Sequence, residues 1–293
     1  MHIPVLLDET LEFLAIRPES VILDTTAGLG GHAGAIARRL STGMVIACDR
    51  DAESLELARQ ATAQVADRIR FVETEFSRLE SALSRIGISS VSGLLADLGV
   101  SRNQLTDPER GFSLQADGPL DMRMSRSQEL TAADLVNQMA EKALADLIFR
   151  LGEEGRSRKI AGAIIRARPI QSTLHLAKVI ERAAPRMGRI HPATRTFMAL
   201  RRAVNGEEEE LEALLDAIPR LVAPGGRAVV ITFMSLEDRK VKQSFQALAR
   251  SGRAMLVNRH VVRPTEREVG QNPASRSAKL RALEMREPLG GDE

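Results

Sequence analysis

The residue types and spacing that point to chemistry lie in the first hundred residues of this chain of 293. A glycine-rich turn, Gly28-Leu-Gly30-Gly31-His32-Ala33, follows an apolar run that ends at Asp24. It satisfies the G-x-G-x-x-A form of the dinucleotide fingerprint, in which glycines permit a tight strand-to-helix turn and close backbone approach to a ligand. Asp49 stands about 20 residues after Gly28, where a carboxylate can accept hydrogen bonds from ribose hydroxyls. The pattern predicts a site for a nucleoside cofactor.

Two more aspartates narrow the class of cofactor. Asp24 lies four residues before the first glycine, a usual place for an acid in S-adenosylmethionine enzymes. Asp97 ends another apolar run and is expected to face the crevice beyond the strand ends, where ligands bind in open α/β sheets. Nicotinamide-dependent oxidoreductases share the fingerprint and remain an alternative, although the absence of tyrosine excludes a Tyr-x-x-x-Lys catalytic pair. The alternative to any cofactor site is that the glycines form only a structural tight turn and that the aspartates merely end their strands.

The elements that position these residues are indicated by short apolar runs that alternate with helical periodicity, as in stacked βαβ units. Strands are predicted at 21–24, 44–49, 69–72, 93–97 and 227–233. Helices are predicted after the glycine turn, from 52 to about 63, and around 211–215. The first and last parts of the chain therefore predict one parallel α/β sheet.

The middle of the chain has a different pattern. Residues 113–205 contain no convincing strand. A capping box at 131–134 opens a helix whose apolar positions continue to Ile148, and a second helix is expected from Ser172 to before Pro185. We therefore predict an α/β domain formed by residues 1–112 and 206–293, interrupted by a helical insertion domain of residues 113–205.

Composition excludes several classes of protein. Hydrophobic residues make up 43% and charged residues 27%, an ordinary globular composition. No apolar run approaches the roughly 20 residues that cross a bilayer, and the acidic N-terminal residues do not resemble a signal peptide. Cys48 is the single cysteine, so an intrachain disulfide and a thiolate-rich metal site are excluded. The histidines have no zinc spacing. We expect a cytoplasmic protein without a bound metal.

The charged residues are distributed in blocks along the chain. Residues 113–205 carry 16 basic and 9 acidic side chains, a net of +7, and residues 239–286 carry 12 and 3, a net of +9. Such blocks predict a basic surface for a polyanion such as RNA. Because 35 of the 41 basic residues are arginine, a GC-rich genome is the alternative explanation. With no Trp or Tyr and 8 Phe, an aromatic platform for stacking bases is not expected.

Several motifs together resemble one family, the bacterial ribosomal RNA small-subunit methyltransferase H, or MraW, family. They occur in order along nearly the whole chain: His2-Ile-Pro-Val-Leu-Leu-Asp-Glu9, Gly30-Gly-His32, Asp97-Leu-Gly-Val-Ser101, Arg110-Gly-Phe-Ser113, Gly118-Pro-Leu-Asp-Met-Arg-Met124, Gly152-Glu-Glu154, His191-Pro-Ala-Thr-Arg-Thr-Phe197, Ser235-Leu-Glu-Asp-Arg239 and Asn272-Pro-Ala-Ser-Arg-Ser-Ala-Lys-Leu-Arg281. The resemblance implies methyl transfer from S-adenosylmethionine to the exocyclic N4 of a cytidine near the ribosomal P site. It also implies a class I (Rossmann-like) S-adenosylmethionine methyltransferase sheet with an inserted all-helical domain.

The resemblance also implies roles for individual residues and a partner. The implied cofactor contacts are Gly30, Gly31, His32, Asp49, Phe76, Asp97 and Gln104. Asp97 is in addition the candidate catalytic residue, as a hydrogen-bond partner of the target amino group or as its proton acceptor. The implied partner is small-subunit rRNA, within the subunit or a late assembly intermediate, with no membrane; oligomeric state stays open, a homodimer being one option. The candidate RNA contacts are Arg195, Arg201, Arg276, Lys279 and Arg281.

Two positions depart from the family pattern. Met234 stands where the family usually has histidine, and Met198 where it usually has glutamine. Because methionine neither titrates nor donates a hydrogen bond, Met234 cannot act as a base. A non-catalytic RNA-binding or ribosome-assembly factor therefore remains a second alternative.

Overall fold

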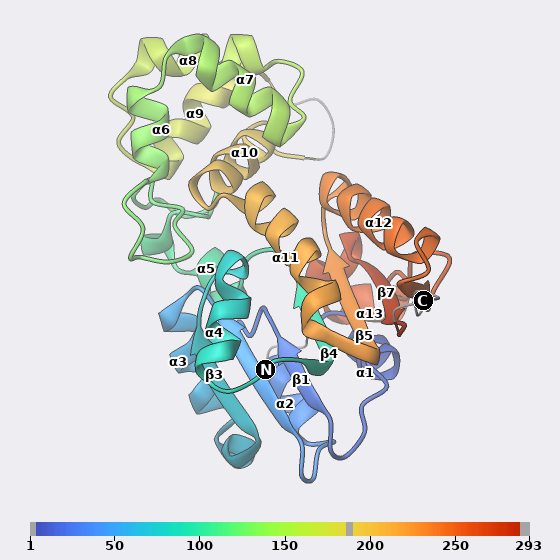
Figure 1. Ribbon diagram of the computed structural model, residues 1–293. Coiled ribbons are helices and arrows are strands. Elements are labelled where there is room, and N and C mark those ends of the chain that lie inside the picture. The colour runs from blue at the N-terminus through green and yellow to red at the C-terminus, as the bar shows by residue number, and fades with distance from the viewer. Residues whose placement is uncertain (1–3, 186–189, 288–293) are drawn as a thin grey trace. The chain divides into compact units, whose positions relative to one another are not determined.

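The computed structural model describes residues 4–185 and 190–287, which form two compact units (Figure 1). One unit contains the chain up to Gly99 and again from Glu209 onward, and the other contains Val100–Glu208. We call them the sheet unit and the helical unit and describe each by itself.

The sheet unit is built on a seven-stranded sheet with the strand order β3-β2-β1-β4-β5-β7-β6. Its strands are β1 Val21–Asp24, β2 Met44–Asp49, β3 Ile69–Glu73, β4 Val91–Asp97, β5 Val222–Thr232, β6 Ala254–Leu256 and β7 Lys279–Met285. The first five are mutually parallel, whereas β7 pairs antiparallel with both β5 and β6. The predicted strands at 21–24 and 44–49 have the bounds of β1 and β2, and those at 69–72, 93–97 and 227–233 correspond to β3, β4 and β5 with ends displaced by one to five residues.

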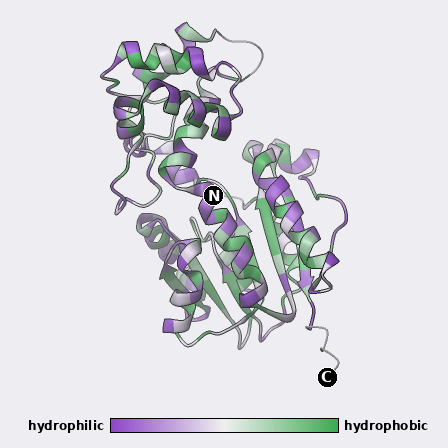
Figure 2. Ribbon diagram, turned by 45° about the horizontal axis from the view of Figure 1, so that its top comes forward, coloured by the Kyte–Doolittle hydropathy of each residue, from purple (hydrophilic) through white to green (hydrophobic). Residues whose placement is uncertain are grey.

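Both faces of the sheet are covered by helices, because alternate residues of each strand point to opposite faces. Leu23, Ile46 and Leu94 pack with residues of α4, α11 and α12, whereas Ile22 and Val45 pack with residues of α1, α2 and α3. Figure 2 shows strands that are hydrophobic along most of their length and helices with a hydrophilic side. The helices of this unit are α1 Leu7–Phe13, α2 Gly31–Ala37, α3 Ala52–Ala61, α4 Leu79–Arg85, α11 Glu207–Leu221, α12 Ser235–Arg250 and α13 Glu266–Gln271, with 3-10 turns η1 Ala63–Arg68, η2 Phe76–Arg78 and η4 Pro273–Ser277.

One row of paired residues locates the carboxyl edge of the sheet, the edge at which β1, β2, β4 and β5 end. Asp97 is paired with Ile231, Ile231 with Leu280, and Leu280 with Val262. Val262 belongs to the segment 257–278, which joins β6 to β7 and which we call the β6–β7 connection. The connection therefore reaches the same edge as Asp97. The sequence patterns did not predict either β6 or β7.

The helical unit has its own hydrophobic core. Its elements are α5 Arg102–Thr106, η3 Pro108–Arg110, α6 Ala132–Gln138, α7 Glu141–Gly152, α8 Ser157–Ala167, α9 Thr173–Ala183 and α10 Thr194–Val204. No strand occurs among its described residues, in agreement with the expected helical insertion. Ser172 caps α9 by accepting the N–H of His175, and Thr131 caps α6 in the expected capping box.

Two details differ from the sequence expectations. The helix expected from 131 to 148 is divided into α6 and α7, because Met139 and Ala140 are extended. The Arg168 guanidinium donates to the carbonyls of Val136 (2.7 Å) and Met139 (2.6 Å), which gives these carbonyls partners outside a continuous helix. The helical unit also begins at Val100 and ends at Glu208, rather than spanning 113–205.

The earlier start of the helical unit has a physical cause in buried contacts. Phe112 packs in the core of this unit. Arg110 is 1% exposed, and its guanidinium donates to the carbonyls of Arg123 (3.1 Å) and Met124 (2.7 Å). The segment before residue 113 is therefore packed and hydrogen-bonded within the helical unit.

Among the described residues, no helix is both long enough and apolar enough to span a membrane.

Candidate active site

The glycine-rich turn lies between β1 and α2 and is fixed to the end of β2. The Ala27 N–H donates to the carbonyl of Cys48 (2.8 Å), and the Gly28 N–H donates to Oδ2 of Asp49 (2.8 Å). Gly30 has a φ of +80°, the left-handed region that glycine adopts without strain. The turn and the aspartate that the fingerprint paired in sequence are therefore in direct contact.

The Asp49 carboxylate is held in place by backbone donors. Its Oδ1 accepts the N–H of Asp51 (3.0 Å), and its Oδ2 accepts the N–H of Gly28. Burial raises the pKa of Asp49 to about 6, although these N–H groups act in the opposite direction. Each carboxylate oxygen of Asp49 has a further lone pair, so its two oxygens can still accept hydrogen bonds from two hydroxyls.

Besides Asp49, two further acids, Asp24 and Asp97, lie at the carboxyl edge of the sheet and are connected through Thr26. The Thr26 N–H donates to Oδ1 of Asp24 (3.1 Å), and the Asp97 N–H donates to Oγ1 of Thr26 (2.7 Å). Oδ2 of Asp24 and Oδ1 of Asp97 are buried and have no hydrogen-bond partner among the described residues. Buried polar atoms in native proteins are nearly always paired, so these two oxygens point to a missing ligand group.

The pKa values of the two carboxyl groups favour a positively charged or hydrogen-donating ligand. Burial raises the pKa of Asp24 to about 7. Burial, and after it the negative charge of Asp24, raise the pKa of Asp97 to about 8. A cation placed beside these groups would favour their ionised forms and lower both values. Asp24 lies beside Asp97 through Thr26 and has an unpartnered buried oxygen of its own, so it is a candidate site residue that the resemblance did not include among the cofactor contacts.

His32 lies in the first turn of α2 and connects Asp97 to the start of the chain. Its Nε2 lies 3.0 Å from the carbonyl oxygen of Val5; since a carbonyl only accepts, Nε2 carries the hydrogen. Its Nδ1 lies 3.8 Å from Oδ2 of Asp97. The position of the ring is thus fixed on one side by backbone and faces the catalytic candidate on the other.

Residues 4–6, which we call the N-terminal strap, cross the glycine turn. A Cβ added to Gly31 would lie 2.6 Å from Cγ of Pro4, so the strap packs directly on this glycine. The Leu6 N–H donates to Oε1 of Glu268 in α13 (2.8 Å). The strap therefore connects the turn to the C-terminal part of the sheet unit. No sequence pattern indicated the contact between Leu6 and Glu268, because these residues are 262 positions apart in the sequence.

The remaining two expected cofactor contacts have structural partners of their own. Phe76, in η2 after β3, is half-buried and packs against the hydrophobic core on one face of the sheet. Gln104 lies in the helical unit, where its Oε1 accepts the N–H of Ser101 (3.0 Å) and its own N–H donates to Oγ of Ser101 (3.2 Å). The contacts of Phe76 and Gln104 with a cofactor stay predictions.

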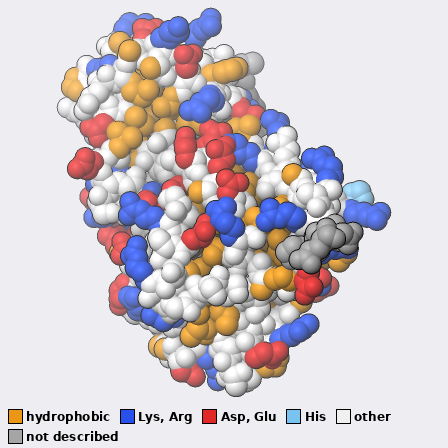
Figure 3. All heavy atoms as spheres, viewed as in Figure 1, with side chains coloured by type: hydrophobic (Ala, Val, Ile, Leu, Met, Phe, Trp, Pro, Cys, Tyr) orange, Lys and Arg blue, Asp and Glu red, His pale blue; other side chains and the backbone are white. Residues whose placement is uncertain are grey.

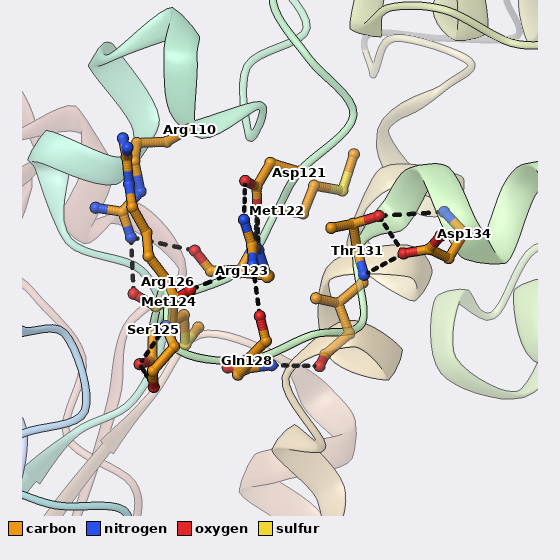
Figure 4. Close-up of polar contacts among 12 residues, drawn as sticks. Arg110, Asp121, Met122, Arg123, Met124, Ser125, Arg126, Gln128, Thr131 and Asp134 are labelled. Atoms are coloured by element: carbon orange, nitrogen blue, oxygen red, sulfur yellow. Dashed lines mark hydrogen bonds and ion pairs between the residues drawn. The ribbon is translucent and has the colours of Figure 1, made fainter.

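The Gly118–Met124 motif and the residues after it, up to Gln128, form a loop of the helical unit that is held by its own side chains (Figure 4). Arg123 makes an ion pair with Asp121 (2.8 Å) and also donates to the carbonyls of Arg126 and Gln128. Figure 4 shows the Arg123 side chain lying between Asp121 and Gln128. Outside the loop, the Asn205 side chain bonds to backbone atoms of residues 122 and 124. The motif therefore specifies a loop of fixed conformation.

The five candidate RNA contacts are not equally available. Arg281 makes a two-fold contact with Asp238 (2.7 and 3.2 Å), and Lys279 lies 3.8 Å from the same carboxylate. Arg201 makes a two-fold ion pair with Glu207, with both contacts at 2.7 Å. Arg195 donates to the carbonyl of Glu153 (3.0 Å), but its side chain is exposed. The fifth candidate, Arg276 in η4, is exposed as well.

Among the described residues, no group of three or more His, Cys, Asp or Glu could hold a metal ion. Cys48 is buried, and burial raises the pKa of its thiol, so it is not an available nucleophile.

Comparison with known proteins adds the family. Residues 1–286 match the family model described as the MraW methylase family. The chain belongs to the MraW methylase family. It is 61% identical to the ribosomal RNA small subunit methyltransferase H of Solibacter usitatus over 98% of this chain and 100% of that protein. It is 49% identical to the protein of the same name from Koribacter versatilis, over 96% of this chain and 93% of that one.

As a member of the MraW methylase family, the chain is a methyltransferase, and its cofactor is S-adenosylmethionine. The expected class, a Rossmann-like α/β sheet with an inserted all-helical domain, is confirmed. The residues present fit the cofactor, because it carries two cationic groups and a ribose. The unpartnered oxygens of Asp24 and Asp97 suit the cationic part, and the held carboxylate of Asp49 suits the hydroxyls.

Proposed function

We propose that this MraW methylase transfers a methyl group to the exocyclic N4 of a P-site cytidine in small-subunit rRNA. The rRNA substrate extends to this chain what the names of its relatives say of them, ribosomal RNA small subunit methyltransferase H. The N4 atom and the P-site cytidine are what the motif resemblance implies. The observation that carries the catalytic part is the pair of buried, unpartnered oxygens on Asp24 and Asp97 at the edge where β1 and β4 end. A protein that only binds RNA has no use for such a costly arrangement.

We assign the proton transfer to Asp97. When bound, S-adenosylmethionine supplies an electrophilic methyl group, while the cytosine amino nitrogen is a weak nucleophile because its lone pair is delocalised. The protein therefore has to align the nitrogen, exclude water and accept one proton as the N–C bond forms and the S–C bond breaks. That proton goes to the Asp97 carboxylate. His32, fixed through the Val5 carbonyl, presents Nδ1 3.8 Å from Oδ2 of Asp97, and because its hydrogen is on Nε2 it is placed to accept from the carboxyl group once Asp97 has taken the proton.

Met234 does not weaken this assignment. It precedes α12, and its N–H donates to Oε2 of Glu237 (3.3 Å) at the start of that helix. Met234 thus helps to begin this helix through its backbone N–H, and that role needs no titrating side chain. A proton acceptor at Asp97 makes a histidine at this position dispensable, which favours the enzyme over a non-catalytic assembly factor.

We further propose a cytoplasmic protein that acts on the small subunit or a late assembly intermediate, since the target base has to be unstacked before it can enter a site. In this proposal the two sequence segments of the sheet unit form the methyltransferase domain, and the helical unit is an insertion that contributes to RNA binding. Arg195 is exposed and remains a candidate contact, whereas Arg201 and Arg281 are engaged in ion pairs.

The function is tested by methyl transfer from labelled S-adenosylmethionine to isolated small ribosomal subunits, followed by mapping of the modified nucleotide. We expect label on N4 of one cytidine. Label on another atom would contradict the substrate assignment, and no transfer despite cofactor binding would favour the assembly factor. Calorimetry with NADH tests the oxidoreductase alternative, and we expect no binding.

Asp49→Ala is expected to weaken cofactor binding by about 1–3 kcal/mol, because the ribose hydroxyls lose their acceptors. The matched variant Asp49→Asn keeps one acceptor oxygen and should lose less. Calorimetry with S-adenosylmethionine measures both. Equal affinity for wild type and Asp49→Ala would remove this residue from the ribose site.

A further inference from the structure

The β6–β7 connection carries basic side chains that the protein itself does not neutralise. Arg259, Arg263, Arg267 and Arg276 are all exposed, and none has an acidic partner among the described residues. The connection contains two acids, and one of them, Glu268, accepts the Leu6 N–H. The basic groups are therefore in excess and free to contact an external anion.

The neighbouring basic residues of β7 are different. Lys279 and Arg281 both contact the carboxylate of Asp238, so their charges hold β7 against α12. Figure 3 shows Lys and Arg side chains with Asp and Glu among them on the face in view, so exposed charge alone does not single out a surface. The presence or absence of an acidic partner does single out a surface, because it separates basic side chains held in ion pairs from those that are available to an external ligand.

The position of the connection relates it to the reaction. Val262 lies in the same row of paired residues as Asp97, through Ile231 and Leu280. The residues that follow Val262, Arg263 and Arg267 among them, therefore lie at or beyond the carboxyl edge, where the acids of the candidate site are found. Arg259 comes directly after Asn258, whose side-chain amide donates to the carbonyl of Leu280 in the same row (3.1 Å). In addition, the bond between Leu6 and Glu268 joins α13, which contains Arg267, to the strap that crosses the glycine turn. The basic groups thus have a fixed position relative to the cofactor residues within one unit.

We propose that the β6–β7 connection is a phosphate-binding surface that holds the backbone of the RNA substrate at the carboxyl edge of the sheet. The proposal rests on the proposed function and specifies where the RNA is held. Guanidinium groups on a surface without acidic partners suit phosphates, because each contact releases counterions from the nucleic acid. The proposal moves the expected C-terminal RNA contacts from Lys279 and Arg281 to Arg259, Arg263 and Arg267, and retains Arg276.

The test compares two triple variants of the full chain. The first, Arg259→Ala/Arg263→Ala/Arg267→Ala, removes the three newly proposed contacts and leaves Arg276 in place. The matched control, Arg17→Ala/Arg39→Ala/Arg85→Ala, removes three exposed arginines that also have no acidic partner among the described residues. Each of these precedes the start of a parallel strand, at the opposite edge of the sheet. Both variants lose the same charge, so non-specific electrostatic effects are equal.

Binding of a labelled small-subunit rRNA fragment is measured as a function of salt. For the first variant we expect weaker binding and a slope of log affinity against log salt that is lower by about 2, since each phosphate contact contributes roughly 0.7 on single strands and 0.9 on duplexes. The control should keep the wild-type slope, and both should keep wild-type affinity for S-adenosylmethionine. Thermal unfolding verifies that both variants are folded.

Equal slopes for the first variant and wild type, or equal losses in both variants, would overturn the proposal. The first result would also be expected if the connection bound an acidic protein instead of RNA. Failure of the proposed function is distinguishable, because it appears in the wild type as an absence of methyl transfer, whereas this comparison uses RNA binding alone.

Discussion

Asp97→Asn is expected to lower kcat for methyl transfer by about 10²–10⁴-fold, the usual contribution of a positioned general base. Asparagine has the same shape but cannot accept a proton at neutral pH. Because one buried oxygen of Asp97 has no partner among the described residues, the substitution should disturb few protein contacts. Single-turnover transfer to small subunits at saturating cofactor measures the effect, and a change of less than about threefold would exclude Asp97 as the proton acceptor.

The pH dependence provides an independent check on the same residue. Only the ionised carboxylate accepts a proton, and the pKa of Asp97 is raised to about 8, so kcat/KM for the cofactor should rise with pH up to that region. Asp24→Asn removes a neighbouring negative charge and should move the midpoint to lower pH, because that charge raises the pKa of Asp97. A flat profile from pH 6 to 9 would contradict the assignment; Asp97→Asn should lose this limb.

Gly30→Val is expected to abolish detectable binding of S-adenosylmethionine. The φ of Gly30 is +80°, and an added Cβ would lie 3.0 Å from Cγ2 of Thr62 and 3.2 Å from Ala58. A branched side chain would therefore strain the backbone and push the turn away from α3. The displaced turn would no longer present its backbone, or the Gly28 N–H that holds Asp49, to the cofactor. Calorimetry measures the loss.

Gly87→Val is the matched control for this substitution. Gly87 has a φ of +77°, but nothing lies within 4 Å of its added Cβ. The control therefore has the same backbone strain without the crowding, and we expect a small decrease in thermal stability with wild-type cofactor affinity. Cofactor binding by Gly30→Val at wild-type strength would mean that the turn has no part in the site.

The sequence by itself determined the parallel part of the sheet and one contact of the site. β1, β2 and β4 are buried on both faces, so they are short apolar runs that are visible without long-range information. The fingerprint likewise paired the glycine turn with Asp49, because strand, turn and following strand are local in sequence. The helical insertion was evident from its periodicity, whereas the compact helical unit runs from Val100 to Glu208, since the buried contacts of Arg110 with residues 123 and 124 are not local.

Only the tertiary structure decided how the other polar groups are used. β6 has three residues and β7 contains three charged residues, so neither has an apolar run, and both are stabilised by pairing with distant strands. The strap contacts, the unpartnered oxygens of Asp24 and Asp97, and the ion pair that occupies Arg281 all depend on residues brought together from separate segments. Residue type and spacing determine local conformation and burial, whereas the availability of a charge depends on which partners folding places beside it.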